Sequence, residues 1–259
     1  VTANVTAGGG SSAKADSDTG TKGIKSGGDM QIVDGTYVID SCDDAIHTNG
    51  SVSIEGGSFT VSTGDDGIHA DETVTVSDGS IGITKCYEGI EGAVVNITGG
   101  DISINASDDG LNAAGGRDQS GFGGRPDNFG NNSSYAINIS GGSFDGGMIS
   151  AYQQQVSHAQ VVRGNFDVTI TGTPTFKAGT VLDATAVKPY AGGSTKATLT
   201  MPGTLSGVTV RRFDEVNGAA QSYTEPLRIV TIGDSITEGY GASFATQSYP
   251  ARIAARLME

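Results

Sequence analysis

Carboxylate side chains recur at a fixed spacing in the first half of this 259-residue chain, and groups of carboxylates are typical cation ligands. Four acids follow one another at intervals of 22, 22 and 21 residues, and three of them have an aspartate directly before them. The full set is Asp43, Asp44, Asp65, Asp66, Glu88, Asp108 and Asp109. In a fold that stacks one repeat on the next, equivalent carboxylates lie about 4.8 Å apart.

Such stacking needs a counter-charge. At an effective dielectric constant of 20, two carboxylates at this separation repel each other by roughly 3 kcal/mol. A cation midway between them lies about 2.4 Å from each oxygen, which is within the calcium–oxygen range. Ligands that are all oxygen favour calcium over zinc. We therefore predict that the seven residues bind calcium; the alternative is that each Asp-Asp pair closes a turn and points to solvent.

Two histidines and two cysteines follow the same spacing. His47 and His69 fall in one column, but no third nitrogen or sulfur ligand accompanies them, so we expect surface polar residues rather than a transition-metal site. Cys42 and Cys86 are two repeats apart, which places their α-carbons about 9.6 Å apart. This exceeds the limit of about 7 Å for a disulfide. The sequence therefore predicts two free thiols.

The elements that carry these residues are short strands of a 22-residue repeat. Each unit alternates apolar and polar residues with a period of two, which is typical of strands. The unit origins are Gly23-Ile24, Ala45-Ile46, Gly67-Ile68, Gly89-Ile90 and Gly110-Leu111, and the turns are Asp34-Gly35, Gly56-Gly57, Asp78-Gly79 and Gly99-Gly100. A unit this short buries its apolar face only by stacking on its neighbours. We predict an all-β parallel β-helix with about 22 residues per rung over residues 21–215.

Departures from the repeat define the remaining segments. Residues 1–20 are rich in Gly, Ser, Ala and Thr, and we expect a flexible lead-in. An inserted loop at 113–134 interrupts the β-helix, and residues 145–215 are less regular but retain strand patterns. Residues 216–226 are expected to form a linker.

Composition excludes several classes of partner. The net charge of -14 argues against binding to a phosphate backbone. No apolar run reaches the length of a membrane-spanning helix, so we expect no membrane insertion. We expect a monomer.

The repeat resembles a family of secreted bacterial carbohydrate-binding β-helix proteins over about residues 20–120. The matching motifs are Ser41–His47, Gly64–Asp71, Tyr87–Gly92 and Ser107–Gly116, with Cys42 and Cys86 standing where small polar residues are usual. The resemblance implies a right-handed parallel β-helix related to calcium-dependent pectate lyases. It also implies calcium bound by the Asp-Asp motifs, plant cell-wall polysaccharide as ligand, and a secreted or cell-surface location.

The last 33 residues carry a separate signal. A strand-like segment is followed by Gly233-Asp234-Ser235 and then by a helical pattern at Ser248–Met258. This arrangement resembles the start of SGNH/GDSL-type esterases, which implies that Ser235 is a nucleophile. A serine nucleophile needs a base, yet every histidine precedes Ser235. We expect residues 227–259 to be an incomplete, truncated α/β strand-turn-helix fragment, inactive as given.

These observations favour a non-catalytic, calcium-stabilised carbohydrate-binding module. One alternative is the targeting module of an SGNH-type carbohydrate esterase. A second is a pectate-lyase-like polysaccharide lyase, for which the candidate bases are Lys25, Lys85, Arg117 and Arg125. A third is a structural surface solenoid.

Overall fold

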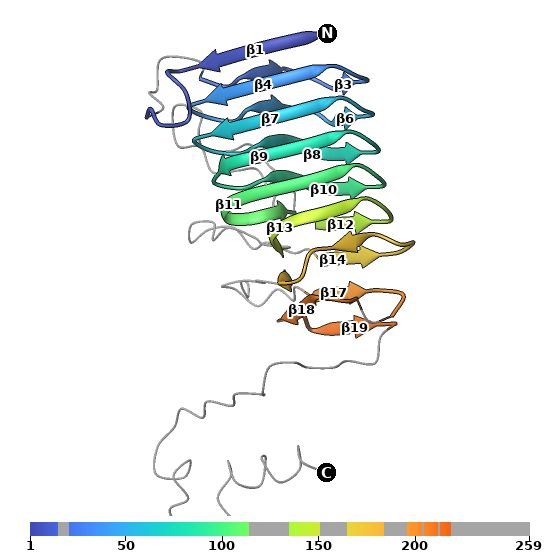
Figure 1. Cartoon of the computed structure of the whole chain (residues 1–259). Helices are drawn as coiled ribbons and strands as arrows, with labels where there is room; N and C mark the ends of the chain where they lie inside the picture. The colour runs from blue at the N-terminus through green and yellow to red at the C-terminus, as the bar shows by residue number, and fades with distance from the viewer. Residues whose placement is uncertain are drawn as a thin grey trace, which may run out of the picture. The chain divides into compact units, whose positions relative to one another are not determined.

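The described residues of a computed structural model form strands and contain no helix (Figure 1). They are residues 1–14, 21–113, 135–150, 165–183, 196–203, 205–211 and 213–218. Contacts divide the chain into Val1–Ser222 and Tyr223–Glu259, and the second unit lies outside the described residues. Over the described part, no helix is long and apolar enough to cross a membrane.

Each regular rung consists of short strands joined by tight turns. The first two rungs contain β2 (Ile24–Ser26), β3 (Met30–Ile32), β4 (Thr36–Ser41), β5 (Ile46–Thr48), β6 (Val52–Ile54) and β7 (Ser58–Thr63). Strands then run together around corners in β8 (Ile68–Val76), β9 (Ser80–Cys86), β10 (Ile90–Ile97) and β11 (Asp101–Asn112). The chain continues through β12 (Tyr135–Ile139), β13 (Ser143–Ser150), β14 (Asn165–Ile170), β15 (Thr175–Phe176), β16 (Thr180–Asp183), β17 (Lys196–Thr200), β18 (Val208–Arg211) and β19 (Glu215–Asn217).

The strand pairings are parallel and follow the predicted repeat. Ile24 pairs with Ile46, Ile46 with Ile68, and Ile68 with Ile90, so each unit origin lies on the next. In Figure 1, β4, β7, β9 and β11 stack on one face, and β6, β8, β10 and β12 stack on another. The all-β parallel β-helix is confirmed.

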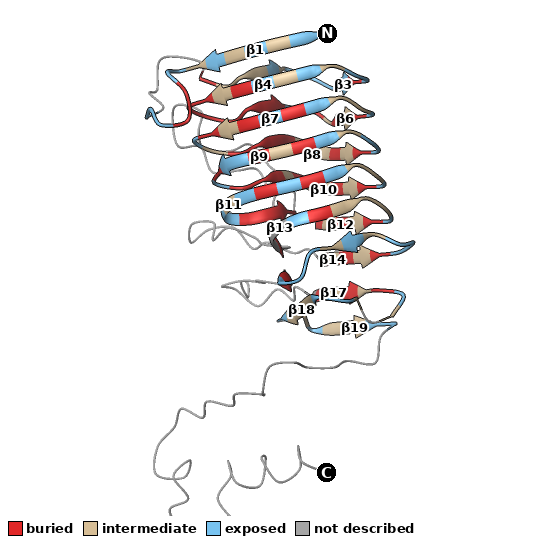
Figure 2. Ribbon diagram, in the orientation of Figure 1, coloured by how far each residue is buried: buried red, intermediate tan, exposed pale blue. Residues whose placement is uncertain are grey.

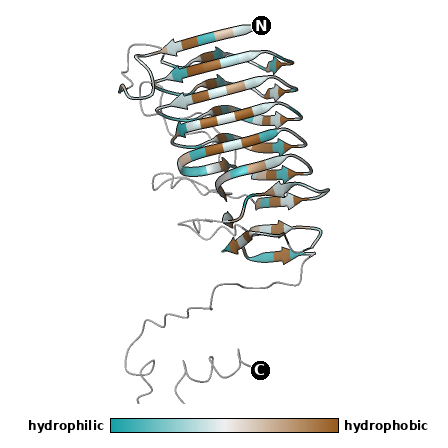
Figure 3. Cartoon of the chain, in the orientation of Figure 1, coloured by the Kyte–Doolittle hydropathy of each residue, from teal (hydrophilic) through white to brown (hydrophobic). Residues whose placement is uncertain are grey.

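The core consists of continuous ladders of Ile, Val and aromatic side chains between these faces (Figures 2 and 3). The Tyr37 and Phe59 rings stack with centroids 4.8 Å apart and an interplanar angle of 8°. Ile81 and Ile102 continue this ladder, as predicted, and Phe144 and Phe176 extend it with a second stacked pair at 5.1 Å. The alternation of two in the sequence thus becomes an apolar interior and a polar exterior.

Glycines at one corner permit the tight turn. Gly57 and Gly79 have φ angles of 101° and 109°, in a region that side chains rarely adopt. A Cβ on Gly79 would also lie 3.0 Å from the carbonyl oxygen of Gly57 in the rung before it. The high glycine content therefore reflects the stacking of turns.

The β-helix extends beyond the predicted segment at its N-terminal end. The expectation of a flexible lead-in over residues 1–20 is wrong for Thr2–Ala7, which forms β1 and pairs in register with β4. Its small residues alternate between half-buried and exposed positions, and the open edge of β4 supplies the hydrogen-bonding partners.

The register also persists after residue 145. Ile137 pairs with Val168, and Val168 pairs with Leu199, so β12, β14 and β17 extend the same face. Glu215–Asn217, at the boundary of the expected linker, forms β19 and pairs with β17. The inserted loop at 113–134 lies outside the described residues except for Ala113, and residues 227–259, including Ser235, lie wholly outside them.

Candidate metal centre

The predicted acids stack at one corner of the β-helix, where the backbone of each rung hydrogen-bonds to the next. We call the stack of Asp44, Asp66, Glu88 and Asp109 the acidic column. All four side chains are buried, so the alternative of solvent-facing turns is wrong for them. Of the preceding aspartates, Asp43 is buried, Asp65 is half-buried and Asp108 is exposed. The seven predicted ligands therefore have different surroundings.

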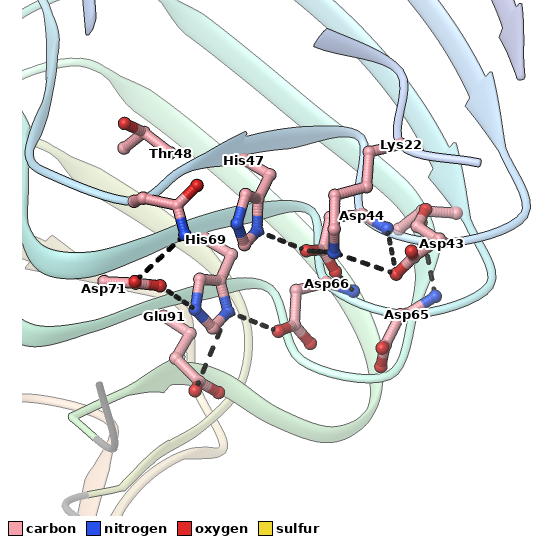
Figure 4. A network of polar contacts seen from close by, with 12 residues as sticks. Lys22, Asp43, Asp44, His47, Thr48, Asp65, Asp66, His69, Asp71 and Glu91 are labelled. Atoms are coloured by element: carbon pink, nitrogen blue, oxygen red, sulfur yellow. Dashed lines mark hydrogen bonds and ion pairs between the residues drawn. The ribbon is translucent and has the colours of Figure 1, made fainter. Parts of the chain in front are cut away.

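A lysine ion pair closes the N-terminal end of the acidic column (Figure 4). Lys22 Nζ lies 3.2 Å from Asp43 Oδ1 and 2.5 Å from Asp44 Oδ2. Burial opposes ionisation of Asp44, but the hydrogen bond with His47 and the charges of His69 and Lys22 outweigh it, and the pKa of Asp44 is lowered. Lys22 was not predicted, although it stands 22 residues before Asp44.

A second column lies three residues further along each rung. We call the in-register stack of Lys25, His47, His69, Glu91 and Asn112 the histidine column. His47 Nδ1 lies 2.8 Å from Asp44 Oδ2, and His69 Nδ1 lies 3.0 Å from Asp66 Oδ2. The two imidazole rings stack with centroids 5.0 Å apart. Both are buried, so the expectation of surface residues was wrong.

Carboxylates on both sides of its strand enclose His69. Asp66 precedes it, and Asp71 Oδ1 lies 3.6 Å from its Nε2. Desolvation lowers the pKa of His69, but hydrogen bonds to Asp66 and Asp71 and the charge of Asp44 raise it well above the ordinary value. The His69 imidazolium thus acts as a second internal cation, after Lys22, in the N-terminal part of the acidic column.

The C-terminal rungs of the two columns carry excess negative charge. Burial and the charges of Asp66 and Asp109 raise the pKa of Glu88 to about 8, against one hydrogen bond that lowers it. That bond comes from Asn112 Nδ2, 2.6 Å from Glu88 Oε2, and the same amide lies 3.2 Å from Glu91 Oε2. Asn112 Oδ1 is buried and has no hydrogen-bond partner among the described residues. The side-chain oxygens of Glu88, Glu91 and Asn112 are thus potential ligands for a cation.

Three groups of side chains are close enough to hold a metal ion in the part of the chain that the structure describes. They are Asp43–Asp44–Asp65, Asp44–His47–His69 and Asp66–His69–Glu91, with ligand atoms within 4.8 Å of one another in each group. The first contains only oxygen, as calcium requires, but Lys22 lies between two of its members. The other two include imidazole nitrogen, which the seven predicted ligands lack.

The structure describes both cysteines and two of the four candidate lyase bases. Cys42 and Cys86 are buried free thiols, as predicted. Burial and the charges of Asp66 and Glu88 raise the pKa of Cys86 to about 12. Lys85 Nζ donates a hydrogen bond to the carbonyl oxygen of Ser11, and Lys25 is exposed. Arg117 and Arg125 lie outside the described residues.

A groove of about 450 Å³ lies on the face formed by β9, β11, β13 and β15. Gly82 has no side chain and leaves room on this face. The charged residues that line the groove are Asp101, Asp145 and Lys177. Lys177 Nζ forms an exposed ion pair with Asp145 Oδ1 at 2.7 Å, and Asp101 accepts a hydrogen bond from a neighbouring serine. The groove therefore offers hydroxyl, carboxylate and ammonium groups to a polar ligand.

Comparison with known protein families matches the N-terminal part of the chain. Residues 1–67 match a family model described as a carbohydrate-binding domain-containing protein. The matched segment spans β1 to β7 and includes Asp43, Asp44, Asp65 and Asp66. The match supports a carbohydrate-binding module. No curated protein and no solved structure matches the chain.

Proposed function

We propose that this chain is a calcium-stabilised, non-catalytic module that binds plant cell-wall polysaccharide of the cellulose or pectin type at a secreted or cell-surface location. The family match over residues 1–67 is the observation that carries carbohydrate binding. The all-β rod supports it, because stacked rungs present long polar faces on which an extended polymer can lie.

Calcium is proposed for the C-terminal part of the acidic column. The fit rests on the buried Asn112 Oδ1, which has no hydrogen-bond partner among the described residues, and on Glu88, whose nearest charges include two carboxylates of the same column. Glu88, Asp109 and Asn112 would supply oxygen ligands there, and calcium would neutralise their charge. At Asp43 and Asp44, Lys22 already provides a cation.

The polysaccharide is proposed to lie along the face that contains the groove around Gly82. Carboxylate side chains on this face can accept hydrogen bonds from sugar hydroxyls, and hydroxyl side chains can both donate and accept them. Lys177 adds a positive charge that attracts the carboxylates of an acidic sugar such as that of pectin.

Pull-down on insoluble cellulose and on pectin tests the binding. We expect the full chain to be retained on at least one of them and to lose retention when Asp101→Ala and Lys177→Ala are combined. The control is Glu55→Gln, an exposed position in the turn after β6 that hydrogen-bonds Gln31. Retention unchanged in the double variant would remove the groove from the proposal, and absence of retention on both polymers would contradict polysaccharide binding.

A further inference from the structure

His69 is the centre of a buried group that the calcium proposal does not use. Its side chain is fully buried, and three carboxylates surround it, from Asp66, Asp71 and Glu91. Figure 4 shows Asp66 and Glu91 on the side of one ring nitrogen and Asp71 on the side of the other. Backbone pairing fixes His69 and Glu91, the carbonyl oxygen of Asp66 accepts a hydrogen bond from the amide of Ala45, and Asp71 follows in β8.

The distances match those between ligands of a small divalent ion. His69 Nδ1 lies 3.0 Å from Asp66 Oδ2 and 3.9 Å from Glu91 Oε1. Ligand bonds of about 2.0–2.2 Å in a tetrahedral site place neighbouring ligand atoms about 3.3 Å apart. One nitrogen and two carboxylate oxygens suit a transition-metal ion better than calcium, which takes oxygen.

The outer contacts hold these three ligands in place. Asp71 Oδ1 lies 3.6 Å from Nε2 of His69, which is the arrangement by which a carboxylate orients a metal-binding imidazole. Asn49 Nδ2 in turn lies 3.3 Å from Asp71 Oδ2. On the other side, Asn112 binds Glu91 Oε2 and leaves Oε1 directed at His69.

Charge also favours an additional cation. The three carboxylates outnumber the single imidazole, so the group is negative even when His69 is protonated. A divalent ion that replaces the Nδ1 proton reduces this excess by one further charge. Lys22 lies on the far side of Asp44 and is paired with Asp43 and Asp44.

We propose that Asp66, His69 and Glu91 form a binding site for a divalent first-row transition-metal ion, for which zinc is the probe. The ion would join the third rung to the fourth, since the ligands come from the segment before β8, from β8 itself and from β10. The site is distinct from the proposed calcium set of Glu88, Asp109 and Asn112, because the two sets share no ligand and only this one contains a nitrogen.

Calorimetric titration of the full chain with zinc, in buffer with millimolar calcium, tests this site. We expect one equivalent to bind and calcium not to displace it. His69→Gln and Glu91→Gln should each weaken zinc binding by at least about tenfold to a hundredfold. Both substitutions are suited to the fold, since an amide already stands in the same column at Asn112.

The matched control is His47→Gln, which changes the stacked neighbour and leaves the three ligands intact. It should retain zinc binding, and a loss as large as that of His69→Gln would overturn the assignment. Cobalt(II) titration of the wild-type chain provides a readout without a variant, as visible absorption that zinc abolishes. Absence of zinc binding, or equal displacement by calcium, would also overturn the proposal. The calcium response of His69→Gln should persist, which separates this site from the proposed function.

Discussion

The two ends of the acidic column solve the same electrostatic problem in different ways. At the N-terminal end, Asp44 pairs with Lys22 and accepts a hydrogen bond from His47, and Asp66 lies 3.0 Å from the imidazole of His69, whose pKa is raised. At the C-terminal end, Glu88 accepts an amide hydrogen bond from Asn112, and the charges that act on it among the described residues are those of acids such as Asp66 and Asp109. The strand register is continuous through both ends.

This difference shows that stacked carboxylates do not by themselves define a metal site. Coulomb repulsion between rungs is of the same order throughout the column. At the N-terminal end, Lys22 supplies the counter-charge. At the C-terminal end, we propose that calcium bound by oxygen ligands supplies it.

Lys22→Met should cause the largest loss of stability. The substitution keeps the unbranched apolar stem but removes the ammonium group from the buried carboxylates of Asp43 and Asp44, which costs about 3–5 kcal/mol. Urea denaturation measures the change in the free energy of unfolding. Lys25→Met is the control, because Lys25 is exposed and should cost no more than about 0.5 kcal/mol. Equal losses for the two variants would contradict the internal-cation interpretation.

Calcium should stabilise the chain through its C-terminal ligands. At a free concentration one hundred times the dissociation constant, the expected gain is about 3 kcal/mol, and the melting temperature should rise with calcium concentration. Glu88→Gln combined with Asp109→Asn should abolish the response, whereas Asp43→Asn should keep it. The reverse pattern would place calcium at the N-terminal end, and no shift between EDTA and millimolar calcium would exclude calcium.

In the absence of calcium, the free energy of unfolding should fall as pH rises, because the buried carboxyl group of Glu88 ionises. Its pKa is about 8 in the folded chain against an ordinary 4.5, so the folded state retains a proton that the unfolded state releases. The contribution is therefore present at low pH and is lost between about pH 4.5 and pH 8. In EDTA, we expect the stability of wild type to fall over this range and that of Glu88→Gln to stay nearly constant.

Urea midpoints across the same pH range provide the measurement, with Glu55→Gln as the exposed control. Parallel curves for wild type and Glu88→Gln would mean that Glu88 ionises normally.

The smallest expected effect is in thiol reactivity. The Cys86 thiol is buried, and its pKa is raised to about 12, so it should not react with a disulfide reagent while the chain is folded. In a Cys42→Ser background, calcium should slow any residual labelling of Cys86, because labelling requires opening of the fold and bound calcium stabilises the closed state. Rapid labelling in the presence of calcium would show that the C-terminal end is open.

Much of this architecture is encoded in simple spacing. The recurrence of Ile24, Ile46, Ile68 and Ile90 predicts the register, and the two-residue alternation predicts which side chains are buried. β1 was missed because its six residues are small and do not share the repeat, although the edge of β4 is sufficient to order them.

The partners within the candidate site were harder to predict. Strand alternation places His69 outside, next to the inward Ile68, but Asp66 and Asp71 from either side of it close over the imidazole. Lys22 carried a usable signal, since it stands one repeat before Asp44. A search restricted to acids passes over it. Charge compensation depends on the directions of the side chains at a corner, and the sequence repeat does not predict those directions.

One corner of the β-helix has consequences for how such a chain can change. Asn112 pairs with Ser150, and Ser150 with Asp183, so β11, β13 and β16 all end at the same corner. In the second rung, only Asn49, Gly50 and Ser51 join β5 to β6 there. Each doubling of a connection costs only about 0.6 kcal/mol in closure entropy. We therefore expect a longer connection between β5 and β6 to cost little in closure entropy, so that this corner can vary in length while the ladders on either side keep their register.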